Sequence, residues 1–232
     1  MIGHNVIIAN PFARLGNNTD DVIEKGGFGA VLARAGVGKT ALLVQLALNH
    51  LLRNRKVLHI SLNDPVNKIS LWYKEIFNNL SEQNTAPNSQ QILESILPYR
   101  FIMTFKVEGF SVPKLEERLT DLTEQNIFSP DLVIIDGLPF DDQVHTTLTE
   151  LKTLAANKNM SFWFTVTIHR HEMGDDALLP SNIKNVADHF DIIIQLRPQG
   201  KMIHVYSTKK ENGSLNESPL VFDPAAMILR EK

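Results

Sequence analysis

Several residue types that would define a function are missing or scarce in this chain. It contains no cysteine, which excludes disulfide bonds and thiolate metal sites and fits a reducing cytosol. Its 23 Lys and Arg residues are outnumbered by 26 Asp and Glu residues, so no overall basic field favours nucleic acid. No apolar run approaches the roughly 20 residues of a membrane-spanning helix, and residues 1–6 lack the basic start of a signal peptide. We therefore expect a soluble, cytoplasmic protein without a membrane contact.

The apolar residues that are present, 43% of 232, suffice for one α/β domain with a full core. They form near-continuous, mostly β-branched runs that alternate with helical patterns, which is typical of a parallel sheet covered by helices on both faces. Six runs are expected to form strands: Phe28–Leu32, Val57–Leu62, Phe101–Phe105, Leu132–Ile135, Phe162–Ile168 and Ile192–Leu196. We therefore predict a single α/β domain over residues 1–232, with a mostly parallel central sheet flanked by helices.

Three stretches are expected to lie outside this parallel core. Residues 1–25 are expected to form an N-terminal extension. Residues 201–222 predict a C-terminal β-hairpin, because an alternating run is followed by the turn residues Glu211-Asn212-Gly213 and a second apolar run. Residues 81–90 are rich in Asn, Gln and Ser and predict a disordered surface loop.

The most informative stretch is residues 33–40, whose sequence ARAGVGKT is that of a phosphate-binding P-loop with Ala33 in place of the usual first Gly. A strand pattern precedes it and a helix pattern follows, so backbone N–H groups and a helix dipole would point at a phosphate. Lys39 is expected to contact the β- and γ-phosphates, and the hydroxyl of Thr40 to ligate Mg²⁺. The expected cofactors are ATP and Mg²⁺, and the expected nucleotide-binding residues are Ala35, Gly36, Val37, Gly38, Lys39, Thr40 and Ala41.

A carboxylate about a hundred residues later supplies the second half of such a site. Asp136 ends the apolar run Leu132–Ile135, and ligands of open α/β sheets bind at the carboxyl ends of strands. At that point Asp136 can hold Mg²⁺ beside Thr40, directly or through water. The alternative is that Asp136 only stabilises the turn that follows, since Asp-Gly is a common turn pair.

The order of these elements resembles the RecA-type ATPases, in particular their KaiC-like and replicative-helicase branch. The resemblance covers about residues 20–222, and its specific motifs are Ala33–Thr40 and Leu132–Asp136. It implies that the strand Phe162–Ile168 lies between the P-loop strand and the Asp136 strand. It also implies that a polar residue near the end of that strand, Thr165, Thr167 or His169, senses the γ-phosphate.

The chain departs from the RecA-type pattern where the resemblance implies a catalytic Glu that polarises the attacking water. Asn63 takes the Glu position of the helicases, and Asp64 matches the second Glu of the KaiC-like pair. Because Asn cannot accept a proton, the role of base falls to Asp64, with Lys39 as the other catalytic residue. Asp is one methylene shorter than Glu, and a displacement near 1 Å can cost about a hundredfold in rate, so slow hydrolysis is expected.

A second departure lies in the hairpin, where RecA-type relatives often send a Lys and an Arg to the γ-phosphate of a neighbouring subunit. Lys209 and Lys210 keep the cations, but Glu211 stands where an Arg would be expected. These lysines form either a trans-acting finger or a solvated hairpin tip. A third departure lies in two loops, at residues 137–142 and 169–182, which in DNA-handling relatives line a channel. Both loops carry carboxylates in this chain, and carboxylates repel the phosphates of DNA.

These observations leave several functions open. The first is a slow ATPase that acts as an assembly or signalling switch, with a homo-oligomer or another protein as partner. The second is a nucleotide-binding scaffold that does not hydrolyse ATP. A DNA recombination or helicase-type motor is disfavoured by the acidic loops, so nucleic acid is not an expected partner. A small-molecule kinase is disfavoured because no arginine cluster suggests a lid.

Overall fold

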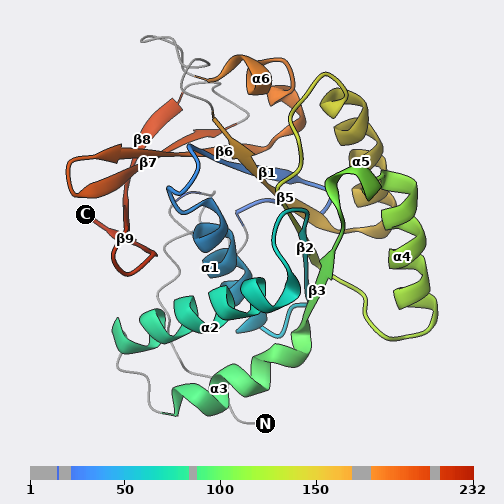
Figure 1. The fold of residues 1–232 in the computed structure, drawn as a ribbon, viewed down its shortest axis with the longest axis horizontal. Coiled ribbons are helices and arrows are strands. Elements are labelled where there is room, and N and C mark those ends of the chain that lie inside the picture. The colour runs from blue at the N-terminus through green and yellow to red at the C-terminus, as the bar shows by residue number, and fades with distance from the viewer. Residues whose placement is uncertain (1–14, 16–21, 84–87, 169–178, 210–214) are drawn as a thin grey trace.

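The computed structural model describes residues 15, 22–83, 88–168, 179–209 and 215–232. Within these residues the strands form one sheet of nine, in the order β3-β2-β4-β5-β1-β6-β7-β8-β9 (Figure 1). The strands are β1 (Phe28–Ala33), β2 (Val57–Ser61), β3 (Arg100–Thr104), β4 (Leu132–Asp136), β5 (Ser161–Thr167), β6 (Ile192–Gln199), β7 (Met202–Lys209), β8 (Leu215–Asp223) and β9 (Ile228–Glu231).

The first six strands are parallel and form the core that the sequence predicts. All six expected runs are strands, and their ends differ from the expected ones by at most three residues. Strand β5 lies between β1 and β4, as the resemblance implied. The predicted α/β fold with a mostly parallel sheet is confirmed.

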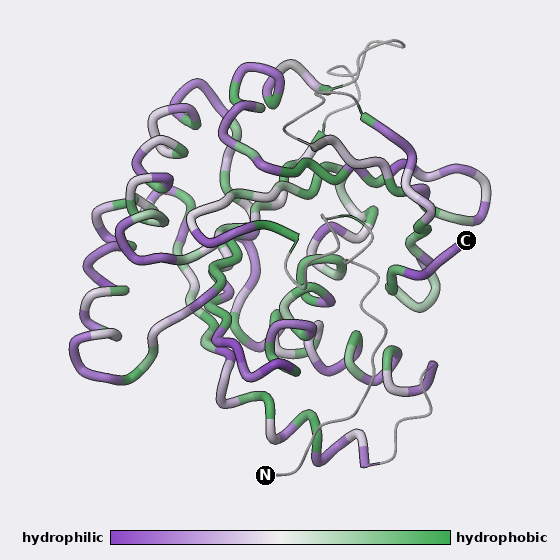
Figure 2. Tube along the Cα trace, turned by 180° about the vertical axis from the view of Figure 1, so that it is seen from behind, coloured by the Kyte–Doolittle hydropathy of each residue, from purple (hydrophilic) through white to green (hydrophobic). Residues whose placement is uncertain are grey.

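Helices cover both faces of this sheet. They are α1 (Lys39–Leu51), α2 (Val66–Gln83), α3 (Ser89–Ile96), α4 (Val112–Glu124), α5 (Val144–Lys158) and α6 (Ser181–Lys184), with short 3₁₀ turns at Leu97–Tyr99, Val107–Gly109 and Ala187–His189. Buried side chains of α1, α2 and α3 share one core cluster, whereas those of α4 and α5 share a second cluster on the opposite face. Figure 2 shows hydrophobic residues along the central strands, between the two helix layers.

The C-terminal part of the sheet is larger than the predicted hairpin. Strands β7 and β8 do pair antiparallel, but β6 also pairs antiparallel with β7, and β9 adds a further strand to β8. The tight turn at Gly200, whose φ is +61°, joins β6 to β7 and was not predicted. The predicted C-terminal hairpin is therefore confirmed as β7 and β8, and with β9 it forms an antiparallel extension of three strands beside β6.

The expected loop over residues 81–90 is also corrected in part. Helix α2 continues to Gln83 and α3 begins at Ser89, and residues 84–87 between them lie outside the described part. Helix α3 forms because Ile92, Leu93 and Ile96 are spaced to bury one face against the core, a pattern that the polar composition obscured. Most of the expected N-terminal extension also lies outside the described residues.

Candidate nucleotide-binding site

The P-loop connects β1 to α1 at the carboxyl edge of the parallel strands, where ligands of this sheet type bind. Two of its glycines have left-handed backbone angles, with φ of +78° at Gly36 and +108° at Gly38. Side chains rarely tolerate these angles, so glycine allows the turn that the motif predicts. Gly38 occupies the N-cap of α1, and its carbonyl accepts the N–H of Leu42 at 2.9 Å. The positive end of the α1 dipole therefore faces the loop.

The Lys39 ammonium lies within this loop. Its Nζ donates hydrogen bonds to the carbonyl oxygens of Ala33, at 3.0 Å, and Arg34, at 3.1 Å. Burial lowers the pKa of the Lys39 ammonium below its ordinary value, and the Asp136 carboxylate opposes that shift. The cation is thus held between two neutral carbonyls, which a phosphate anion can replace as its partner.

The two expected metal ligands meet in space although 96 residues separate them. Thr40 Oγ1 donates a hydrogen bond of 2.7 Å to Asp136 Oδ2. The other carboxylate oxygen, Oδ1, accepts a 2.7 Å bond from the Thr165 hydroxyl, which itself accepts the N–H of Gly137 at 2.9 Å. Thr165 is buried, so this chain of bonds fixes the orientation of the Asp136 carboxylate.

This donor set suits Mg²⁺. Mg²⁺ prefers oxygen ligands, and in nucleotide sites it is held by one or two carboxylates together with phosphate oxygens and water. Thr40 and Asp136 supply a hydroxyl and one carboxylate at the loop that would hold the phosphates. The described residues contain no cluster of three or more His, Cys, Asp or Glu side chains that could hold a metal without a nucleotide.

The side chains of Asn63 and Asp64, which occupy the expected position of the catalytic base, have different partners. The Asn63 amide packs over Gly137, in the space that a Cβ at this glycine would need, next to Asp136. The Asp64 carboxylate instead forms an ion pair of 2.9 Å with Lys68 in the first turn of α2, and the Asp64 N–H donates to Ser61 Oγ at 2.9 Å. An amide thus faces the site, and the nearest expected proton acceptor is engaged by a lysine.

The remaining expected site residues are spread over the sheet. Among the sensor candidates, Thr165 reaches Asp136, Thr167 is exposed at the end of β5 opposite Ala33, and His169 lies outside the described residues. Lys209 pairs in register with Ile192 at the start of β6, so its backbone lies at the sheet edge opposite the P-loop of the same chain. Lys210 also lies outside the described residues.

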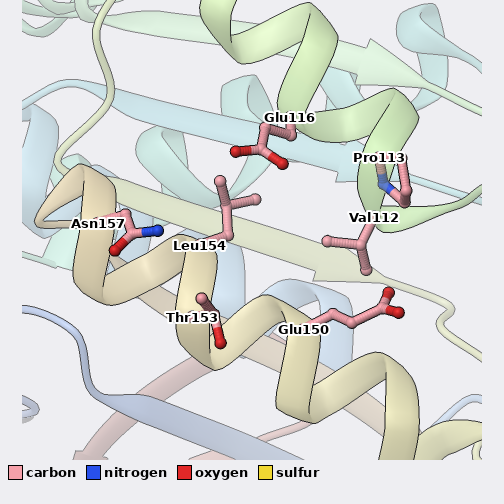
Figure 3. Close-up of a pocket in the computed structure, with 7 residues that line it drawn as sticks. All are labelled: Val112, Pro113, Glu116, Glu150, Thr153, Leu154 and Asn157. Atoms are coloured by element: carbon pink, nitrogen blue, oxygen red, sulfur yellow. The ribbon is translucent and has the colours of Figure 1, made fainter.

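A surface cavity of about 230 Å³ lies away from the P-loop, between α4 and α5 (Figure 3). Its lining residues are Val112, Pro113, Glu116, Glu150, Thr153, Leu154 and Asn157. The volume is below the roughly 300–1,000 Å³ that is usual for ligand pockets. Its two charged residues are the carboxylates Glu116 and Glu150, which would repel a phosphate, so this cavity is not the nucleotide site.

Comparison with known proteins agrees with this geometry. Residues 7–140, more than half of the chain, match the family described as AAA domain. The chain belongs to this AAA domain family. A solved structure whose title describes it as an ATPase domain has the same fold, with a TM-score of 0.66 and 17% sequence identity over 90% of this chain and 86% of that chain. A search of curated proteins finds no match.

Family membership and fold together confirm the resemblance to RecA-type P-loop ATPases. The family match includes the P-loop and extends past Asp136, so it contains both halves of the candidate site. In the described part of this AAA domain protein, no helix has the length and apolar character needed to cross a bilayer.

Sequence reasoning identified the P-loop and Asp136, but it named Thr165 only as one of three candidate sensors and not as the partner of Asp136. Its signal was a polar residue within an apolar strand, which by itself does not distinguish a sensor from an orienting group. Phe222 was not recognised at all: its ring lies against Gly38, and a Cβ added to that glycine would lie 2.6 Å from Phe222 Cε1. No local sequence pattern indicates a contact between residues so far apart in the chain.

Proposed function

We propose that this protein binds ATP with Mg²⁺ at Gly36–Thr40, hydrolyses it slowly, and acts as an assembly or signalling switch. The observation that carries this proposal is the 2.7 Å contact between Thr40 and Asp136 directly beside Lys39. A hydroxyl, a carboxylate and a cation at a helix N-terminus are the groups that hold a Mg²⁺–triphosphate. When bound, Mg²⁺ would neutralise charge that develops on the phosphates.

The position of Lys39 supports a role in phosphate binding. Its ammonium already lies inside the loop on the carbonyls of Ala33 and Arg34, so it needs only a small movement to meet an anion. Ala35 and Gly36 are exposed at the rim, and Val37, Gly38 and Lys39 are partly exposed, which leaves the loop accessible to a ligand. Lys39 would then both bind the nucleotide and stabilise charge during hydrolysis.

Slow hydrolysis is supported by the arrangement of Asn63 and Asp64. The Asn63 amide can hydrogen-bond a water molecule but cannot take its proton, and general-base catalysis contributes about 10²–10⁴-fold to rates. Asp64 stays our candidate for the base, and it would have to leave Lys68 or act while paired with it. Both features predict turnover well below the enzyme median of about 10 s⁻¹.

The same ion pair favours a second candidate function, a nucleotide-binding scaffold without hydrolysis. If Lys68 holds Asp64 permanently, that carboxylate is not available to activate water. A nucleotide-dependent role would then rest on binding alone, through ordering of the loop and its neighbours.

Assembly would give Lys209 a role at the phosphates. Its backbone lies at the sheet edge opposite the P-loop of the same chain, so a contact between this residue and a γ-phosphate would require a neighbouring copy. A DNA motor is disfavoured because Asp141 and Asp142, which follow the Asp136 strand, are exposed carboxylates with no cation partner among the described residues.

Calorimetric titration with ATP and Mg²⁺ tests the site. Lys39→Ala should abolish binding, and Thr40→Ala should remove its dependence on Mg²⁺. Thr147→Ala is the matched control, since this threonine on α5 bonds to the carbonyl of Gln143, away from the P-loop. Unchanged affinity in Lys39→Ala would refute the site. Steady-state phosphate release then separates the slow ATPase from the scaffold, and light scattering with a non-hydrolysable ATP analogue tests nucleotide-dependent assembly.

A further inference from the structure

The last two strands of the chain lie against the phosphate loop and its helix. The Phe222 ring, on β8, lies against Gly38, with Cε1 at 2.6 Å and Cζ at 3.0 Å from where a Cβ would stand. Phe222 is fully buried and belongs to the same core cluster as Ala41 and Leu42 at the start of α1, and Val37 packs against that cluster. The ring therefore supports the loop from the side of α1 and the C-terminal strands.

This contact falls at one of the two loop glycines whose backbone angles are left-handed. Gly38 has a φ of +108°, a left-handed conformation that glycine reaches but does not prefer over its other allowed states. Fixing the backbone of one residue costs roughly 1–2 kcal/mol of conformational entropy. A ring packed against Gly38 reduces the number of backbone conformations that this glycine adopts in the free protein. Nucleotide binding then costs less conformational entropy.

Strand β9 holds this support in place through hydrogen bonds to α1 and α2. The Leu229 N–H donates to Gln45 Oε1 at 2.8 Å, and Gln45 Nε2 donates to the Leu229 carbonyl at 3.5 Å. In the turn before β9, the Ala226 carbonyl accepts a 2.8 Å bond from Asn79 Nδ2. Gln45 is buried on the P-loop helix, so displacement of β9 would leave a buried amide without these partners. Figure 1 shows β9 beside α1.

We infer that Phe222 is a positioning residue for the phosphate loop, and that the β8–β9 pair is the element that keeps it there. This inference rests on the proposed nucleotide site and adds a residue that touches neither nucleotide nor metal. Because coupling between sites is reciprocal, a nucleotide that orders Gly38 also stabilises the contacts of Phe222 and the docking of β9 on Gln45. Binding of a nucleotide at the loop thereby stabilises β9, the outer strand of the sheet.

The test compares Phe222→Leu with Phe162→Leu. Phe162, on β5, is equally buried but belongs to the core cluster on the other face, so both variants lose a ring and only one loses the contact with Gly38. Calorimetry with ATP and Mg²⁺ should show affinity lowered roughly 5- to 30-fold in Phe222→Leu, the equivalent of ordering one backbone residue. Phe162→Leu should bind like the wild type after correction for the folded fraction.

Hydrogen exchange without nucleotide provides a second readout that does not depend on the proposed function. The amides of residues 36–40 should exchange faster in Phe222→Leu than in wild type or Phe162→Leu. If the wild type binds no ATP, the proposed function fails, while faster exchange at the loop still supports the positioning role. Equal exchange at the loop in the two variants overturns the inference, and so does equal ATP affinity in the two variants when the wild type binds ATP.

Nucleotide should also increase the protection of the Leu229 amide in the wild type, and less so in Phe222→Leu. Protection of Leu229 that does not respond to saturating ATP would overturn the link to β9.

Discussion

Lowering the pH from about 7 to about 5 should destabilise this protein through one buried histidine. His59 lies on β2 with no exposed surface, its Nδ1 3.1 Å from the Tyr73 hydroxyl, beneath α2. Burial lowers the pKa of His59 from 6.5 to about 4; the charge of Asp136 raises it, and that of Arg100, which lies over the Tyr73 ring, lowers it further. Among the described residues His59 Nε2 has no hydrogen-bond partner, so no acceptor there compensates a second proton.

The direction of this change in stability follows from proton linkage. Between about pH 6.5 and pH 4 the unfolded chain binds a proton at His59 that the folded chain does not, so stability falls as the pH falls through this window. The full shift corresponds to about 3 kcal/mol, of which about 2 kcal/mol is lost between about pH 7 and about pH 5. That is a large share of the 5–15 kcal/mol, roughly, that stabilises a typical domain.

Urea unfolding at the two pH values measures this loss. In His59→Gln, which cannot titrate, the difference between the two pH values should shrink by about 2 kcal/mol, even if the variant is less stable at neutral pH. His204→Gln, which removes a histidine from the partly exposed side of β7, serves as the control and should keep the His59-dependent loss. If His59→Gln loses as much stability as the wild type, His59 is not buried in its neutral form and the reasoning is wrong.

Three further substitutions test other parts of the structure. Gly29→Ala should destabilise the protein by about 1–3 kcal/mol because a Cβ would lie 2.7 Å from the buried Trp163 ring; urea unfolding followed by tryptophan fluorescence measures this, and an unchanged midpoint contradicts the packing. Asn63→Glu should raise phosphate release roughly tenfold or more if the missing carboxylate limits the rate, and an unchanged rate would show that Asn63 does not limit it. Thr165→Val should weaken Mg²⁺-dependent ATP binding roughly tenfold, since Asp136 loses one of its two hydroxyl donors, whereas binding without Mg²⁺ should change little in calorimetry.

The parallel core was predictable because its signals are local. Strands buried on both faces need near-continuous apolar runs, and polar or turn residues follow these runs within two positions. The P-loop was predictable for a similar reason: a turn with left-handed glycines can be recognised from Gly36, Gly38 and their neighbours alone. Asp136 was predictable because ligands of such a sheet bind at the carboxyl ends of its strands, and Asp136 ends one of these strands.

The C-terminal extension was less predictable because its strands are not buried on both faces. Strand β9 has four residues, of which Ile228 and Leu229 are buried and the last two are exposed, so its pattern is too short to separate from a loop. Its place is decided by partners elsewhere, namely β8 and the Gln45 side chain on α1.

The sequence by itself determined the class of the protein, the positions of its parallel strands along the chain, and the P-loop and Asp136 at which we propose that a Mg²⁺–nucleotide binds. Only the tertiary structure decided which residues contact one another: Thr165 bonds to Asp136, Asp64 pairs with Lys68, and the Phe222 ring lies against Gly38. The physical reason is how far apart in the chain the interacting residues lie. Backbone conformation and apolar periodicity are set by neighbours in the chain, whereas a hydrogen bond, an ion pair or a ring contact between distant residues exists only once packing has placed both partners.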